Sequence, residues 1–182
     1  MIPDNITPIL MKCEDLGFEN ILFQCCIHYA EQGLNVWFIS PQPFKELPLD
    51  IKPPDEEVLK LITFLYLKDQ QDLLTHLNGI HLWHKFPQLI ILNGFEHYSM
   101  MLSSDYNLSN AAFTLASLLD ATSTCALKHS SMKAYLLVAC VVPPPDRYAH
   151  LDTLTSLYFP HVCTYNNNNC DIFNVFKNVF KR

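Results

Sequence analysis

A short, fully apolar run that ends at a polar residue and a glycine constrains the fold of this chain more than any other feature. Residues 89–92 are Leu-Ile-Ile-Leu, and Asn93 and Gly94 follow directly. A run without polar alternation is typical of a strand buried on both faces of a parallel sheet. Ligands of open α/β sheets bind at the carboxyl ends of the strands. Asn93 is therefore a candidate functional position.

Strand and helix patterns alternate along the whole chain. Apolar runs predict strands at residues 9–12, 35–40, 61–67, 89–93, 134–142 and 162–165, and helical spacing of apolar residues predicts helices at 19–32, 69–84, 107–127 and 150–159. Five prolines within residues 41–54 indicate an extended loop. This alternation predicts a mostly parallel sheet with helices on both faces, a three-layer α/β/α sandwich.

The length of 182 residues fits one domain, with its core at about residues 8–165 and a short tail at 166–182. Apolar residues of the tail, from Ile172 to Phe180, are spaced as in an amphipathic helix. Such a helix either docks a partner or closes the core of its own chain, and we favour the second interpretation. A β-strand is an open alternative because Val and Phe favour strands.

Charge and cysteine content limit the classes of function. The net charge is −6, and only 12 Lys and Arg residues are scattered along the chain, so a nucleic-acid role would require a more basic partner. The longest apolar run, residues 134–142, is too short to span a membrane. The chain has seven cysteines, and its N-terminal segment lacks the character of a signal peptide. Together these features indicate a reducing compartment, the cytosol or nucleus.

Glycine is scarce, with four residues in the chain. Nucleotide-binding loops use glycines because the backbone approaches phosphates closely, and the motif ends in Gly-Lys-[Ser/Thr]. None of the four glycines is followed by lysine. The sequence therefore excludes an intact phosphate-binding loop of this kind.

Five stretches of the chain stand in a distinctive order and spacing. They are Pro8-Ile9-Leu10 leading to Leu22-Phe23; Ala30-Glu31-Gln32-Gly33 with Val36-Trp37-Phe38-Ile39; Pro43-Phe44-Lys45-Glu46-Leu47-Pro48; residues 89–98; and Ala111-Ala112 through Leu118-Leu119-Asp120 with Leu157-Tyr158-Phe159-Pro160. In the order and spacing of these five stretches, the chain resembles the RecA-like recombinase paralogues. The likeness is closest to the small, ATPase-like paralogue that pairs with a SWIM-type zinc-finger protein in the animal Shu complex.

This resemblance implies a RecA-like P-loop NTPase core with degenerate nucleotide motifs. In this resemblance, residues 12–19 match the phosphate-binding loop, with Gly17 as its last glycine. Phe18 then stands in the place of the lysine, and Glu19 stands in the place of the hydroxyl residue that binds magnesium. Asn93 stands in place of the aspartate that holds magnesium. Because charge-assisted hydrogen bonds contribute about 1.5–3 kcal/mol each, we expect no triphosphate binding. The resemblance thus implies no enzymatic activity, catalytic residue, cofactor or metal.

Glu96 is the remaining candidate for a general base. Without a nucleotide it has no water to activate, so we expect a solvated or capping carboxylate instead.

The functional expectation also comes from the resemblance. It implies a structural subunit that forms a heterodimer with a SWIM zinc-finger protein in the nucleus. The pair would promote assembly or stability of RecA-like recombinase filaments on single-stranded DNA during homologous-recombination repair of DNA damage, with DNA contacted through the complex. Two alternatives stay open: a RecA-like subunit of another assembly such as the Elongator ring, and a divergent ATPase.

Two further patterns have ordinary structural explanations. Residues 113–116 match the Phe-x-x-Ala pattern by which eukaryotic RecA-like recombinases dock onto one another, but we expect Phe113 and Ala116 to be core residues of a helix. His76, His81 and His84 are predicted to share one helix as polar-face residues, because a zinc site needs about four ligands.

Overall fold

The computed structural model describes residues 2–44, 51, 53–166 and 169–180. The strands are β1 (Ile6–Cys13), β2 (Val36–Ser40), β3 (Ile62–Tyr66), β4 (Leu89–Leu92), β5 (Ala134–Val141), β6 (His161–Asn166) and β7 (Asn169–Cys170). The α-helices are α1 (Phe18–Glu31), α2 (Glu56–Leu59), α3 (Gln70–Asn78), α4 (Phe95–Tyr98), α5 (Leu108–Ala126), α6 (Tyr148–Tyr158) and α7 (Ile172–Phe180), with short 3₁₀ helices η1 (Ile80–Leu82) and η2 (Pro145–Arg147).

The strands form one sheet in the order β3-β2-β4-β5-β1-β6-β7. All neighbours pair in parallel except β6 and β7, which are antiparallel. Every residue of β4 is buried, as expected of a strand covered on both faces. The predicted parallel sheet is confirmed, and the carboxyl ends of its long strands meet at one edge.

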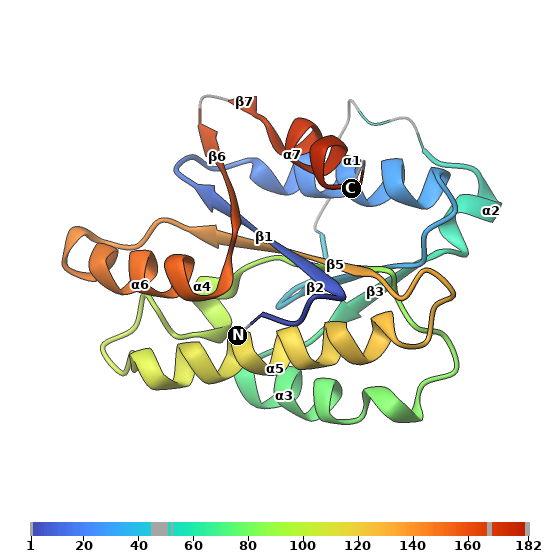
Figure 1. The fold of residues 1–182 in the computed structure, drawn as a ribbon. Coiled ribbons are helices and arrows are strands. Elements are labelled where there is room, and N and C mark those ends of the chain that lie inside the picture. The colour runs from blue at the N-terminus through green and yellow to red at the C-terminus, as the bar shows by residue number, and fades with distance from the viewer. Residues whose placement is uncertain (1, 45–50, 52, 167–168, 181–182) are drawn as a thin grey trace.

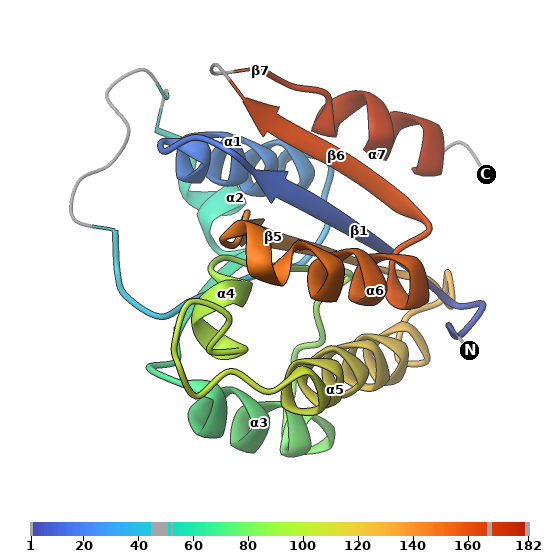
Figure 2. The same cartoon turned by 90° about the vertical axis from the view of Figure 1, so that its left-hand side faces the viewer.

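Helices cover both faces of the sheet (Figure 1). α1 and α7 lie on one face, whereas α3, α5 and α6 lie on the other, and the view in Figure 2 shows the same three layers along the sheet. Each face has its own cluster of buried apolar side chains. The three-layer α/β/α sandwich that the sequence predicts is therefore present.

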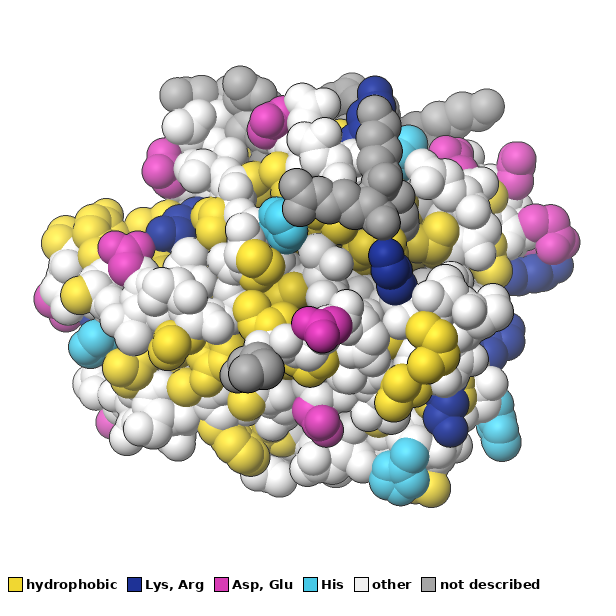
Figure 3. Space-filling model, viewed as in Figure 1, with side chains coloured by type: hydrophobic (Ala, Val, Ile, Leu, Met, Phe, Trp, Pro, Cys, Tyr) yellow, Lys and Arg dark blue, Asp and Glu magenta, His cyan; other side chains and the backbone are white. Residues whose placement is uncertain are grey.

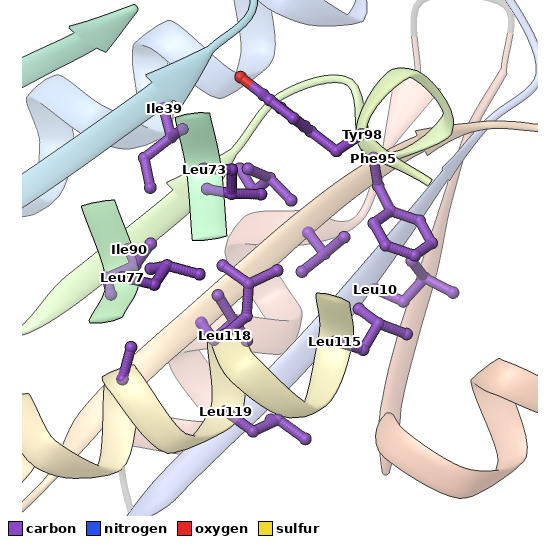
Figure 4. Close-up of a cluster of buried hydrophobic side chains, with 14 of the residues drawn as sticks. Leu10, Ile39, Leu73, Leu77, Ile90, Phe95, Tyr98, Leu115, Leu118 and Leu119 are labelled. Atoms are coloured by element: carbon purple, nitrogen blue, oxygen red, sulfur yellow. The ribbon is translucent and has the colours of Figure 1, made fainter. Parts of the chain in front are cut away.

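The core under α3 and α5 is built mainly from aliphatic side chains, with Phe95 and Tyr98 of α4 in the same cluster (Figure 4). Leu73 of α3 and Leu118 of α5 are both fully buried beside Ile90 of β4. Burial of each such side chain contributes about 1.5–3 kcal/mol. Asn107 caps α5 by accepting hydrogen bonds from the backbone N–H groups of residues 109 and 110.

The C-terminal tail closes the core of its own chain. Ile172 and Phe176 of α7 are buried, at 1% and 0% exposure, and the Phe176 ring lies 4.8 Å from the Tyr29 ring of α1, centroid to centroid. Phe173 packs edge-on against His28, with 5.4 Å between centroids. The interpretation that the tail is a helix closing the core of its own chain is confirmed, and the alternative that residues 172–180 form a strand is wrong.

The predicted helix at residues 69–84 is shorter in the structure. α3 ends at Asn78, and Gly79 leads into η1, so that His76 lies in α3, His81 in η1 and His84 outside any helix. The prediction that these histidines share a helix is therefore wrong.

Phe113 also differs from its prediction as a core residue. It is 59% exposed, and Ala116 is exposed as well, because the buried stripe of α5 follows Ala111, Leu115 and Leu118 instead. Part of the predicted loop at 41–54, including most of the stretch 43–48, lies outside the described residues. None of the described helices is both long and apolar enough to cross a membrane.

Candidate functional site

The candidate site lies at the carboxyl edge of the sheet, where β1, β4 and β5 end. Residues 14–17 connect β1 to α1, and residues 93 and 94 connect β4 to α4. Gly17 and Gly94 precede their helices with φ of +88° and +86°, the left-handed region that favours glycine. Both positions therefore form sharp strand-to-helix turns, and β5 lies between β1 and β4 in the sheet.

Phe18, the first residue of α1, points into the core. Its side chain is 3% exposed and packs edge-on against the Tyr165 ring of β6, with 6.4 Å between centroids. The Tyr165 hydroxyl lies 3.6 Å from the point where a Cβ on Gly17 would stand. The position matched to the lysine of a phosphate-binding loop is thus occupied by a packed aromatic ring.

Asn93 links the ends of two neighbouring strands. Its side chain is 9% exposed, and its Nδ2 donates to the Ser40 Oγ of β2 at 3.5 Å. The Ser40 hydroxyl in turn donates to the Gln42 carbonyl at 2.8 Å, and the Asn93 N–H donates to the Ile39 carbonyl at 2.8 Å. Asn93 is buried at the strand end where the sequence places it, with its amide donating toward the protein.

Glu96, in the first turn of α4, binds the end of β5. Its Oε2 accepts a hydrogen bond of 2.9 Å from the Val141 N–H. Burial raises the pKa of this carboxyl, the backbone N–H groups oppose that effect, and the nearby negative charge of Glu19 raises the pKa further. The geometry agrees with the expected capping carboxylate.

Carboxylates dominate the charge of this edge. Glu14 and Asp15 are exposed in the loop before α1, and Glu19 follows in its first turn. Two basic residues near this edge are already engaged. The Lys12 Nζ lies 2.9 Å from the Asp152 carboxylate, and the guanidinium of Arg147 donates to the Met101 carbonyl and lies 5.3 Å from the centroid of the Tyr106 ring.

The structure brings the predicted positions to one edge, but it also adds residues that the sequence did not single out. Gly17, Phe18 and Glu19 share the turn into α1, and Glu19 lies close enough to Glu96 to influence its pKa. Tyr165 and Ser40, the partners of Phe18 and Asn93, carried no local sequence signal. Among the described residues, no three His, Cys, Asp or Glu side chains are grouped so as to hold a metal ion.

Comparison with known proteins identifies the fold. No protein-family model matches the chain, and no curated protein sequence matches it. The flagellar accessory protein FlaH from Methanocaldococcus jannaschii has a similar structure, with a TM-score of 0.54 and 11% identity over 90% of this chain and 74% of FlaH. The conjugation coupling protein TcpA of pCW3, whose structure was solved with ATPγS, has a TM-score of 0.44 and 13% identity. This match covers 91% of this chain and 50% of the TcpA chain.

The similarity to FlaH concerns the fold alone, because the identity is low. Together with the mostly parallel sheet and its two helical layers, it shows that the chain has an α/β RecA-like fold. The predicted fold class is confirmed.

Proposed function

We propose that this chain is a non-catalytic RecA-like subunit that forms a heterodimer with a SWIM-type zinc-finger protein in the nucleus. The pair promotes assembly or stability of recombinase filaments on single-stranded DNA during homologous-recombination repair. One observation carries the non-catalytic part: Phe18 is packed into the core at the position where a phosphate-binding lysine would stand. The process and the partner rest on the sequence resemblance to recombinase paralogues.

The charge of the site supports the absence of nucleotide binding. A triphosphate would approach the exposed carboxylates of Glu14 and Asp15 with Glu19 behind them, and the nearest strand lysine, Lys12, is paired with Asp152. Each charge-assisted hydrogen bond to a phosphate contributes about 1.5–3 kcal/mol. Loss of two such bonds weakens binding by roughly a hundredfold or more, since each 1.4 kcal/mol is a tenfold change.

The surface charge supports a shared role on DNA. The chain carries a net charge of −6, and the basic side chains on the face shown in Figure 3 are scattered and do not form a continuous stripe. Phosphate contacts require clustered Lys and Arg. Under this proposal the partner supplies most of the charge that contacts DNA, and the resemblance implies that it also carries the zinc.

Co-expression with the SWIM zinc-finger protein, followed by size-exclusion chromatography, tests the pairing. We expect one peak that contains both chains at micromolar concentration, and two separate peaks would contradict the proposal. Calorimetric titration of the purified chain with ATP and magnesium tests the non-catalytic part independently. A saturable heat would favour the divergent-ATPase alternative.

A further inference from the structure

A hollow of about 440 Å³ lies beside α4 at the carboxyl edge of the sheet. It is lined by Glu96, His97, Met100, Leu102 and Ser103. Met100 and Leu102 are 43% and 55% exposed, although both side chains are apolar. The backbone of Met100 adopts φ of +55°, which non-glycine residues rarely do.

The polar part of this hollow carries negative charge. One Glu96 oxygen accepts the Val141 N–H, but among the described residues no Lys or Arg forms an ion pair with Glu96. Glu19 adds a second negative charge nearby. His97 donates from Nε2 to the Lys68 carbonyl at 2.6 Å, since a carbonyl can only accept. A partly buried carboxylate with no Lys or Arg partner among the described residues thus lies beside an apolar wall, and the nearby His97 lowers the pKa of Glu96 against the effect of burial.

We propose that this hollow accepts a Lys or Arg side chain from a protein partner. The aliphatic stem of such a side chain packs on Met100 and Leu102, and its cationic head pairs with Glu96. Charge complementarity favours this occupant, because the head would relieve the repulsion between Glu96 and Glu19. A protein is favoured over a free amine because the same edge exposes further apolar side chains, Leu16 at 87% and Tyr148 at 46%, that a larger partner would cover.

This proposal goes beyond the proposed function, because it assigns a surface and a recognition chemistry without reference to the partner's identity. It can therefore be tested without the zinc-finger protein. The probes are two blocked five-residue peptides, each with a central residue between two leucines and alanine at both ends. The central residue is arginine in one peptide and citrulline, its uncharged isostere, in the other.

Two-dimensional ¹H–¹⁵N NMR titration of the full chain measures binding site by site. We expect the arginine peptide to shift the amide signals of residues 96–103 and Val141, and the citrulline peptide to bind at least about tenfold more weakly because the ion pair is missing. Equal binding of the two peptides, or shifts confined to another surface, would overturn the proposal.

Matched variants locate the charge that matters. Glu96→Gln keeps an acceptor for the Val141 N–H but removes the negative charge, so binding of the arginine peptide should fall about tenfold. Glu31→Gln makes the same change at an exposed position near the end of α1 and should leave binding unchanged. If the two variants behave alike, the attraction is only a consequence of net charge and the specific site is refuted. Spermidine that binds as tightly as the arginine peptide would assign the hollow to small amines and refute the protein partner.

Discussion

Replacement of Phe18 tests whether the start of α1 is a structural element. The Phe18 side chain is 3% exposed and forms an edge-to-face pair with Tyr165. Phe→Ala substitutions at buried sites cost about 3–5 kcal/mol, of which an aromatic pair accounts for about 0.5–1.5 kcal/mol. We therefore expect Phe18→Ala to lower the free energy of unfolding by about 3 kcal/mol or more.

Urea denaturation followed by circular dichroism measures this loss, and the midpoint of thermal unfolding should fall by roughly 6 °C or more for a domain of this size. Leu16→Ala is the matched control, because Leu16 lies in the same turn but is 87% exposed. It should change the free energy of unfolding by no more than about 0.5 kcal/mol. A loss below about 1 kcal/mol for Phe18→Ala, or equal losses for the two variants, would show that residue 18 is not a core position.

Three further substitutions test other parts of the structure. Because burial raises the pKa of Glu96, the native state holds its proton more tightly than the unfolded chain, so stability falls as the pH rises from the unfolded pKa, about 4.3, through the raised native pKa. Between about pH 4 and about pH 8, the urea midpoint of Glu96→Gln should therefore fall less than that of the wild type, and parallel profiles would contradict the shift. Phe176→Ala in α7 should cost about 3–5 kcal/mol in urea denaturation, whereas Lys177→Ala, at an exposed position, should be nearly neutral; similar effects would mean that α7 does not close the core. Gly94→Ala should cost about 1–2 kcal/mol because φ is +86°, whereas Gly79→Ala, at φ of −87°, should not destabilise the protein; the reverse order would refute the left-handed turn before α4.

The sequence predicts the fold well where the signal is local. The apolar run of β4 and the long helical stripe of α5 need no knowledge of distant residues, because burial on both faces of a strand leaves an unbroken apolar run and burial of one helix face leaves a helical period. The error at Phe113 arose from judging the residue by its type. Its position is two residues after Ala111, which places it about 200° around the helix and away from the buried stripe.

The site was predictable in its location but only partly in its contacts. A polar residue after a buried strand predicted the place of Asn93, whereas Gly17 was matched through the resemblance of residues 12–19 to a phosphate-binding loop. The burial of Phe18, in contrast, depends on Tyr165, and the role of Glu96 depends on the N–H of Val141. These partners come from other strands of the sheet, so no spacing rule within one segment could reveal them.

The anchoring of α1 has a consequence for how the subunit can respond to its surroundings. One end of this helix is fixed through Phe18 and Tyr165, and the other through Tyr29 and Phe176. A helix held at both ends cannot report a chemical event at the adjacent turn by sliding or tilting. Under the proposed function, we expect the timing of any assembly that contains this chain to come from its other components.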